Sequence, residues 1–257
     1  LSLVGSEMCI RDRYIDMSLA KDIEAYFQEN GIDHEKVAYC ITDLEHNIKY
    51  SMNEKDEFIA ASIYKLPLAM LYYDKVNEGE YTLDSTFTYS GYMHEDAGVI
   101  SSDYGIGSQV PLSDLLNDLI IYSDNDAGHI LYENLGGWKE YKEAMTKYTD
   151  SISENYYTMD NVTTANTMND VVTYLYDHKE DYKGLIKNME EAEPGEYLDR
   201  DTQLSMPQKY GMYDSALNSV GFVECNTSYS IVVLTSLGDK GADVMANINR
   251  IAYEHFK

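Results

Sequence analysis

The order in which hydrophobic periodicity changes along the chain is the feature that most constrains its fold. Strand-like runs occur only near the two ends, whereas the long middle part has the periodicity of helices. Strands are expected at residues 37–43, 48–51, 205–211, 218–224 and 229–237, with the first two forming a hairpin. Helices are expected at residues 18–30, 58–76, 112–122, 127–134, 138–147, 168–176 and 242–256. One mixed sheet must therefore be assembled from both ends of the chain, with a helical region between them.

Composition places the chain among ordinary globular proteins and excludes one class of partner. Its 257 residues are 44% hydrophobic and include only four prolines, which allows a sizeable core in one large or two interlocked domains. The formal net charge is −26, and binding to a phosphate backbone needs clustered Lys and Arg that this chain lacks. We therefore expect no nucleic-acid partner and interpret the excess acid as a solvated surface.

The first thirteen residues, LSLVGSEMCIRDR, have neither helical nor strand periodicity. Residues 8–13 resemble the translated end of a transposon used in sequencing libraries, so we expect residues 1–13 to be a non-native artefact of metagenomic assembly. On that interpretation the native N-terminus, with any export signal or anchor, is missing. No window of the chain is long enough for a membrane-spanning helix.

Cysteine and histidine form no pattern typical of a disulfide framework or a metal site. Beyond residue 13 the cysteines are Cys40 and Cys225, each in a strand-like run, and we expect both to be free, buried thiols. The six histidines include no pair at helical ligand spacing. The sequence therefore predicts neither zinc chemistry nor a histidine-based triad.

Ser62 and Lys65 are the first residues that point to chemistry. They lie about one turn apart in the expected helix 58–76, so the amine can reach the hydroxyl. A serine needs an adjacent base to act as a nucleophile, and a lysine becomes a base only where burial disfavours its ammonium form. A Ser-x-x-Lys pair alone arises by chance about once in a chain this long, so a capped helix with a solvent-seeking lysine is the simpler alternative.

Two further motifs follow in order, Ser123-Asp124-Asn125 and Lys209-Tyr210-Gly211. With Ser-x-x-Lys they resemble the three motifs of the serine β-lactamase and penicillin-binding protein superfamily, Ser-x-x-Lys, Ser-Asp-Asn and Lys-Thr-Gly. Gly136-Gly137 and Thr163-Thr164-Ala165 resemble the starts of two helices in that family. The resemblance covers most of the chain from about Ser18 and is closest to the class A β-lactamase branch.

The resemblance implies an α/β (α+β) fold with a mixed, mainly antiparallel five-stranded sheet flanked by helices, plus an all-helical domain. In this chain residues 14–61 and 201–257 would together form the sheet-containing domain, and residues 62–200 the helical domain, with the active site in the cleft between them. The family works outside the cytoplasmic membrane, so we expect an extracellular or envelope-anchored protein. No metal or organic cofactor is implied.

The resemblance also assigns catalytic roles to four residues. Ser62 would be the acylated nucleophile and Lys65 its base or proton relay. Ser123 would pass a proton to the leaving nitrogen. Lys209 would supply positive charge for a substrate carboxylate and help to tune Ser123.

The implied substrate-binding residues flank these groups. Asn125 would bind the side-chain amide of the substrate, and Gly211 would let the strand approach the ligand. The backbone N–H groups of Ser62 and Met212 would form the oxyanion hole, each worth about 3 kcal/mol. Tyr210 stands where the family has Thr or Ser, so the small hydroxyl that helps to hold the substrate carboxylate is replaced by a bulky ring.

A second departure concerns deacylation. Class A β-lactamases carry a glutamate in a Glu-x-x-Leu-Asn segment that activates the deacylating water, and residues 148–162 contain no such segment. The acids of this loop are Asp150, Glu154 and Asp160, of which Glu154 is a weak substitute. Without that base an acyl-enzyme should form more readily than it is cleared.

Three hypotheses follow. The first is a serine hydrolase or acyltransferase that forms an acyl-Ser62 intermediate with a cell-wall D-alanyl peptide or another small ester or amide. The second is a genuine β-lactamase with a non-standard deacylating group. The third is an inactive, penicillin-recognising envelope module, which would retain Ser62, Lys65, Ser123 and Lys209 without using them.

Overall fold

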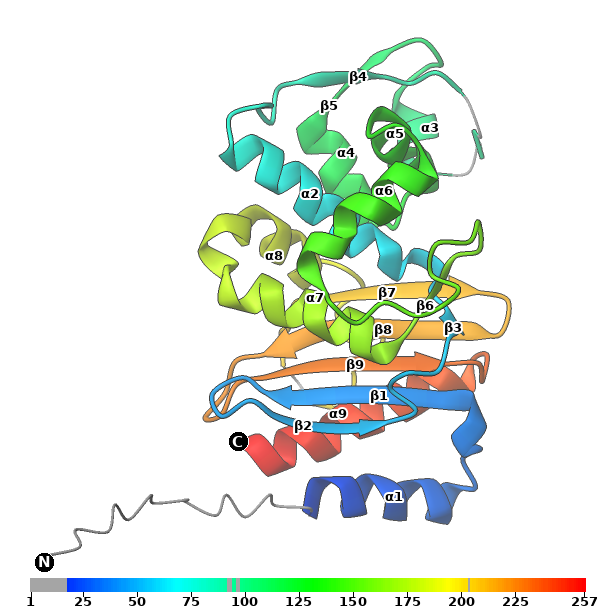
Figure 1. The fold of residues 1–257 in the computed structure, drawn as a ribbon, viewed down its shortest axis with the longest axis vertical. Helices are drawn as coiled ribbons and strands as arrows, with labels where there is room; N and C mark the ends of the chain where they lie inside the picture. Colours follow the sequence, from blue (N-terminus) through cyan, green and yellow to red (C-terminus); the bar gives the residue numbers. More distant parts are fainter. Residues whose placement is uncertain (1–17, 92–93, 96–97, 203) are drawn as a thin grey trace, which may run out of the picture.

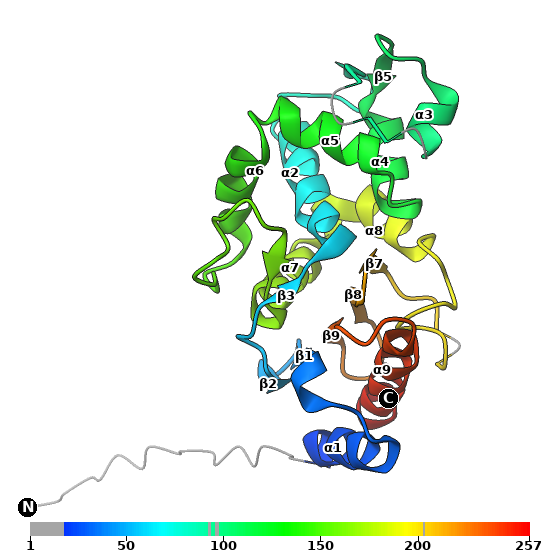
Figure 2. The same ribbon diagram turned by 90° about the vertical axis from the view of Figure 1, so that its right-hand side faces the viewer.

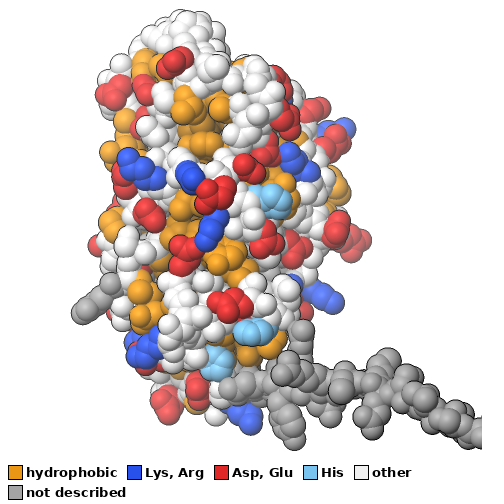
Figure 3. Space-filling model, turned by 90° about the vertical axis from the view of Figure 1, so that its left-hand side faces the viewer, with side chains coloured by type: hydrophobic (Ala, Val, Ile, Leu, Met, Phe, Trp, Pro, Cys, Tyr) orange, Lys and Arg blue, Asp and Glu red, His pale blue; other side chains and the backbone are white. Residues whose placement is uncertain are grey.

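The computed structural model describes residues 18–91, 94–95, 98–202 and 204–257 as a sheet with helices on both of its faces (Figure 1). The expected artefact at residues 1–13 lies outside the described residues. None of the described helices is both long and apolar enough to span a membrane. Acidic side chains are scattered over the whole face drawn in Figure 3, with Lys and Arg between them, as expected of a solvated surface.

The central sheet joins the two ends of the chain, as predicted. Its strands are β1 (Val37–Asp43), β2 (Ile48–Met52), β7 (Gln208–Tyr213), β8 (Ala216–Val223) and β9 (Tyr229–Thr235). They lie in the order β2-β1-β9-β8-β7, and each neighbouring pair is antiparallel. The register of the central pair places Val37 opposite Thr235. The predicted α/β fold with a mainly antiparallel five-stranded sheet is therefore confirmed.

Alternation along β1 explains why its sequence is apolar from Val37 to Ile41. Val37, Tyr39 and Ile41 pack with α1 (Ser18–Asn30) and α9 (Lys240–Phe256) on one face of the sheet. Ala38 and Cys40 point to the opposite face, into the core shared with the other helices. A strand that is buried on both faces has no polar alternation.

The remaining helices form the layer on the other side of the sheet (Figure 2). They are α2 (Lys65–Asn77), α3 (Val99–Asp103), α4 (Leu112–Ile121), α5 (Asn125–Asn134), α6 (Trp138–Met145), α7 (Ala165–Asp177) and α8 (Lys183–Glu190). Helix α7 lies directly on the sheet, whereas α2, α4, α5 and α6 pack together farther from it (Figures 1 and 2). The domain division at residues 62 and 200 stays a prediction.

Two small ribbons and four short 3₁₀ helices complete the described chain. Strand β3 (Phe58–Ile59) pairs with β6 (Val162–Thr163), and β4 (Thr86–Thr88) pairs with β5 (Gln109–Pro111). The 3₁₀ helices are η1 (His34–Lys36), η2 (Ala61–Tyr64), η3 (Thr146–Tyr148) and η4 (Lys179–Tyr182).

The predicted helix 58–76 is wrong at its start. Residues Phe58–Ile59 form strand β3, Ala61–Tyr64 form the 3₁₀ helix η2, and the α-helix begins only at Lys65. The cause is tertiary, because Ala61 has a φ of 49° and side chains from distant segments bind the carbonyl groups of this turn. Ser62 therefore lies in a tight turn between a strand and a helix.

Two helices begin earlier than predicted because polar side chains cap them. Helix α5 begins at Asn125, where the Asp124 carboxylate accepts a hydrogen bond from Ala127 N at 2.8 Å. Helix α7 begins at Ala165, where the Thr164 hydroxyl accepts one from Thr167 N at 3.0 Å. Short or weakly periodic elements, namely α3, α8, β3, β4, β5 and β6, were not predicted.

Candidate active site

Lys65 connects the first two sequence motifs through its ammonium group. Nζ lies 3.1 Å from Ser62 Oγ, 2.5 Å from Ser123 O, 3.4 Å from Ser123 Oγ and 2.5 Å from Asn125 Oδ1. Ser62 comes from η2, Lys65 from the first residue of α2, and Asn125 from the first residue of α5. Residues that are about 60 positions apart in sequence thus meet around one nitrogen atom.

Burial makes Lys65 a candidate base. Its side chain is fully buried, and this desolvation lowers its pKa to about 7, although the negative charges of Asp124 and Glu95 act in the opposite direction. A neutral amine has two N–H bonds and one lone pair. The carbonyl oxygens of Ser123 and Asn125 can only accept, so they engage the two N–H groups and leave the lone pair for the Ser62 hydroxyl.

Ser123 lies in a strained turn between α4 and α5. Its φ of 56° is in the left-handed region, which costs a non-glycine residue about 1–3 kcal/mol. The neighbouring Asp124 holds the turn, because its N donates to Asp118 O at 2.9 Å and its carboxylate accepts from Ile100 N at 3.1 Å. This arrangement points both the carbonyl and the hydroxyl of Ser123 toward Lys65.

Two asparagine side chains hold the turn that precedes the nucleophile. Asn218 Nδ2 donates to Ile59 O at 2.8 Å and to Ala60 O at 3.0 Å, and Asn161 Nδ2 donates to Ala61 O at 2.9 Å. The three successive carbonyl groups before Ser62 are therefore all bound. Sequence reasoning missed both asparagines, because nothing local distinguishes them from ordinary strand and loop residues.

Gly211 brings strand β7 against the same turn. A β-carbon at this position would lie 2.7 Å from Ser62 N, 2.8 Å from Ile63 N and 3.0 Å from Ala60 O. Only glycine allows the two backbones to come this close. Met212 follows on the strand, and its side chain is 61% exposed.

Lys209 is buried on β7 beside Tyr210. Its Nζ donates to Tyr210 O at 2.9 Å and lies 4.1 Å from the centre of the Tyr210 ring. Burial, and then the nearby positive charge of Lys65, keep the pKa of Lys209 well below its usual range. Within the described residues, no hydrogen bond joins Lys209 to Ser123. The Tyr210 ring stacks on Tyr197 at a centroid distance of 4.8 Å.

A buried lysine organises the loop between α6 and α7. Lys142 Nζ donates to three loop carbonyl groups, Tyr156 O at 2.6 Å, Thr158 O at 2.9 Å and Asp160 O at 2.6 Å. Burial lowers the pKa of Lys142. Sequence reasoning missed this residue, although a basic residue next to Tyr141 in the apolar stripe of the expected helix 138–147 is the pattern that could have revealed it.

The loop acids lie away from these contacts. Asp150, Glu154 and Asp160 are exposed, and in the described part of the chain none of them is hydrogen-bonded to Ser62 or Lys65. The carboxylates whose charges act on Lys65 are those of Asp124 and Glu95. The described residues also contain no group of three His, Cys, Asp or Glu side chains that could hold a metal ion.

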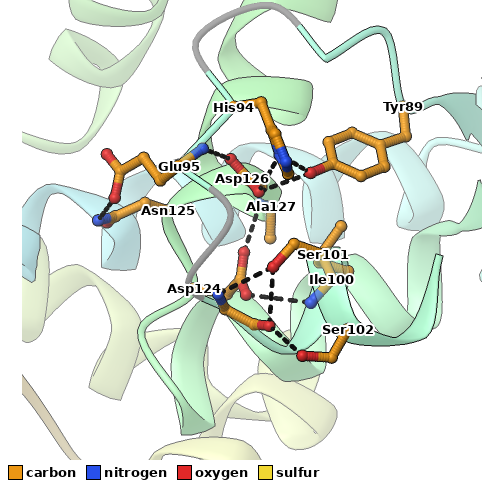
Figure 4. A network of polar contacts seen from close by, with 11 residues as sticks. Tyr89, His94, Glu95, Ile100, Ser101, Ser102, Asp124, Asn125, Asp126 and Ala127 are labelled. Carbon is orange, nitrogen blue, oxygen red and sulfur yellow. Dashed lines mark hydrogen bonds and ion pairs between the residues drawn. The ribbon is translucent and has the colours of Figure 1, made fainter. Parts of the chain in front are cut away.

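Glu95 is a further residue that sequence reasoning missed. Its Oε2 accepts a hydrogen bond from Asn125 Nδ2 at 2.6 Å (Figure 4). A cavity of about 380 Å³ lies beside this pair and is also lined by Ser123 and Ser102. No sequence motif signals Glu95, which comes from the connection between β4 and α3.

Comparison with known proteins agrees with this fold. The family model described as "Beta-lactamase enzyme family" matches residues 18–256. Among solved structures, a β-lactamase from Chitinophaga pinensis DSM 2588 superposes with a TM-score of 0.77 at 21% identity, covering 93% of this chain and 100% of that one. A mutant of PBP-A, solved as an acyl-enzyme complex with penicillin G, superposes with a TM-score of 0.79 at 16% identity, covering 93% and 96%.

These structural neighbours show the fold, and they include both hydrolysing and penicillin-binding members. TLA-3 extended-spectrum β-lactamase superposes with a TM-score of 0.78 at 20% identity, covering 93% of this chain and 98% of that one. The family match spans nearly all of the described residues and includes the three motifs, of which the first two meet at Lys65. The chain belongs to the beta-lactamase enzyme family and has the serine-hydrolase fold of class A β-lactamases.

Proposed function

We propose that this protein is an active-site-serine hydrolase or acyltransferase that works through an acyl-Ser62 intermediate. The observation that carries the proposal is the position of Lys65 Nζ, which is buried and 3.1 Å from Ser62 Oγ. A buried amine with a pKa of about 7 is partly neutral at physiological pH and can accept the serine proton. The substrate class is a small ester or amide, including cell-wall D-alanyl peptides and β-lactams.

Acylation then proceeds in two proton-transfer steps. Ser62 Oγ attacks the carbonyl carbon of the substrate while its proton passes to Lys65 Nζ. When the tetrahedral intermediate collapses, the bond to the leaving nitrogen or oxygen breaks. The proton moves from Lys65 through Ser123 Oγ, 3.4 Å away, to that leaving atom. An ester on Ser62 and an amine or alcohol result; with a β-lactam the amine stays part of the ring-opened adduct.

The oxyanion and the substrate carboxylate need separate partners. We assign the oxyanion to the backbone N–H groups of Ser62 and Met212, and the close approach of Gly211 to Ser62 N supports this assignment. Lys209 supplies positive charge from β7. Asn125 binds the amide of the acyl group through Nδ2, since Oδ1 is engaged by Lys65.

Slow deacylation is the second part of the proposal. No carboxylate of the loop at residues 148–162 is engaged with Ser62 or Lys65 among the described residues, and Glu154 is exposed. The loop instead binds Lys142 through its carbonyl groups and the Ala61 carbonyl through Asn161. An acyl-enzyme without a general base beside its ester should persist, as in a penicillin-binding protein.

We propose a location from what is typical of the family. Its class A members are typically exported, so we place this protein outside the cytoplasmic membrane, in the medium or attached to the cell envelope. Cells that express the gene with its native upstream sequence test this placement by fractionation and surface protease treatment.

Intact-mass spectrometry after incubation with benzylpenicillin tests the function. We expect an adduct of the mass of the penicillin that persists for many minutes and is absent in Ser62→Ala. An adduct that disappears as the penicillin is consumed would favour the β-lactamase alternative. If neither benzylpenicillin nor a fluorophosphonate labels Ser62, the inactive recognition module is favoured instead.

A further inference from the structure

Glu95 and Lys65 hold the two ends of one amide group. Asn125 Nδ2 donates to Glu95 Oε2 at 2.6 Å, while Asn125 Oδ1 accepts from Lys65 Nζ at 2.5 Å. The amide is therefore oriented by an anion on one side and by an amine on the other. Since Nδ2 carries two hydrogens, one remains for the carbonyl group of a substrate. An acyl group bound to Asn125 must lie next to the Glu95 carboxylate.

The backbone of Glu95 is fixed to the helix that carries Asn125. Glu95 N donates to Asp126 Oδ1 at 3.0 Å, and Asp126 Oδ2 accepts from Tyr89 Oη at 2.7 Å and contacts His94 Nδ1 at 3.0 Å (Figure 4). Asp126 is 3% exposed, near the start of α5. This anchoring sets the distance between the carboxylate and the proposed acyl site.

Among the carboxylates that line the cavity, Glu95 differs from Asp124 and Asp126. Those two are buried, and backbone N–H groups or the Tyr89 hydroxyl occupy their oxygens. Glu95 is exposed, and its Oε2 contacts Asn125. No Lys or Arg occurs among the described residues that line the cavity. A cation supplied by the substrate would therefore meet a carboxylate that no basic side chain of the cavity neutralises.

We propose that Glu95 is a specificity-determining residue that selects acyl groups bearing an ammonium next to the amide carbonyl that Asn125 binds. The inference rests on the acyl-Ser62 function proposed above. One oxygen of Glu95 keeps Asn125 oriented, and the other receives the ammonium. With Lys209 on β7 at the carboxylate end, the site fits a substrate that is positive at its acyl side chain and negative at its leaving group.

Two pairs of probes that differ only by an ammonium test this selection. The first pair is ampicillin and benzylpenicillin, and the second is the p-nitrophenyl esters of phenylalanylglycine and N-(3-phenylpropionyl)glycine, in which the ammonium also lies next to an amide carbonyl. The second-order rate constant for acylation of Ser62 is measured by intact mass for the wild type, Glu95→Gln and Glu133→Gln. Glutamine keeps an acceptor for Asn125 Nδ2 but removes the charge, and Glu133 is an exposed acid at the other end of α5.

The comparison uses the ratio of the two rates within each pair, because intrinsic reactivity cancels between proteins. We expect the ratio of ammonium-bearing to neutral probe to be about fivefold higher in the wild type and Glu133→Gln than in Glu95→Gln, as for an exposed ion pair. The same ratio in all three proteins would overturn the inference and leave the proposed function standing. If no probe of either pair acylates Ser62, both fall.

Discussion

Gly211 and Ser62 approach so closely that a side chain on the strand would overlap the backbone of the nucleophile. The β-carbon of any other residue at position 211 would lie 2.7 Å from Ser62 N. Because that N–H is one of the two proposed oxyanion donors, the spacing between β7 and η2 sets the width of the proposed oxyanion hole. The position therefore affects chemistry as well as packing.

Gly211→Ala is expected to slow acylation by benzylpenicillin about 100-fold, the cost of displacing one oxyanion donor. It should also lower the free energy of unfolding by about 1–3 kcal/mol through overpacking. Quenched time courses followed by mass spectrometry measure the rate of acylation, and urea denaturation measures the free energy of unfolding. Gly105→Ala is the matched control, since the nearest heavy atom to its β-carbon is Ser108 Oγ at 3.9 Å. Normal acylation by Gly211→Ala would contradict the assignment of Ser62 N.

The rate of acylation should follow the titration of Lys65. Burial lowers its pKa to about 7, so the neutral amine accumulates as the pH rises through 7, and the rate should rise and then level off. Asn125→Asp places a carboxylate where Oδ1 lies 2.5 Å from Nζ. This charge favours the ammonium, raises the pKa of Lys65 and should move the rising limb up by about one pH unit or more.

Rate profiles over about pH 5 to 10 check this shift, with Asn134→Asp at the far end of α5 as the control that keeps the wild-type midpoint. A midpoint that does not move in Asn125→Asp would show that a group other than Lys65 takes the Ser62 proton.

Lys142→Met should loosen the loop between α6 and α7. It removes a buried ammonium from three carbonyl groups, and an unsatisfied buried acceptor costs about 1–3 kcal/mol. We expect a loss of about 3 kcal/mol in urea denaturation and new protease cleavage within residues 149–161. Lys139→Met, which removes an exposed pair with Glu143 on the same helix, should change stability by less than about 0.5 kcal/mol. Unchanged proteolysis of Lys142→Met would show that the loop is held by other contacts.

Tyr210→Thr should improve substrates that carry a carboxylate. The substitution removes a ring that stacks on Tyr197 and lies against Lys209 Nζ. It introduces the small hydroxyl that the Lys-Thr-Gly motif of the resembled family has at this position. A hydroxyl bound to a charged group contributes about 1.5–3 kcal/mol, so acylation by benzylpenicillin should rise about 10-fold or more. Acylation by the p-nitrophenyl ester of N-(3-phenylpropionyl)glycine, which carries no carboxylate, should keep its rate. Tyr197→Leu separates loss of stacking from gain of the hydroxyl, and an equal gain in that variant would exclude carboxylate recognition as the cause.

The sheet and the long helices were predictable because their hydrophobic patterns are local consequences of burial. Strands β1 and β9 are mostly apolar because they are buried on both faces along their whole length, and α9 repeats its apolar stripe over 17 residues. The predicted helix 58–76 was wrong at its start because Asn218, more than 150 residues away, donates to carbonyl groups that would otherwise accept hydrogen bonds within a helix. Such a contact leaves no periodic pattern at either end.

The candidate site likewise contains residues that the sequence predicts and residues that it does not. The one-turn spacing of Ser62 and Lys65 predicted that they form a pair. The order of the three motifs predicted Ser123, Asn125 and Lys209 as further site residues. Glu95, Asn161 and Asn218 could not be found, because each acts through a single side chain that reaches a backbone or amide group distant in sequence. Lys142 could have been suspected from its place in the apolar stripe of the expected helix 138–147, but the carbonyl groups that it binds are known only from the fold.

The pairing of β1 with β9 also determines when the protein can fold. Asp43 lies opposite Tyr229, so the centre of the sheet forms only by closing a loop of at least 229 − 43 = 186 residues. Such long-range pairing is slow, because the loop-closure entropy is lost before the strands gain their contacts. On the ribosome, β1 has no partner on that side until nearly all of the chain has been synthesised. A nascent chain of this kind stays open, and chaperones or an export machinery can bind it before the sheet closes.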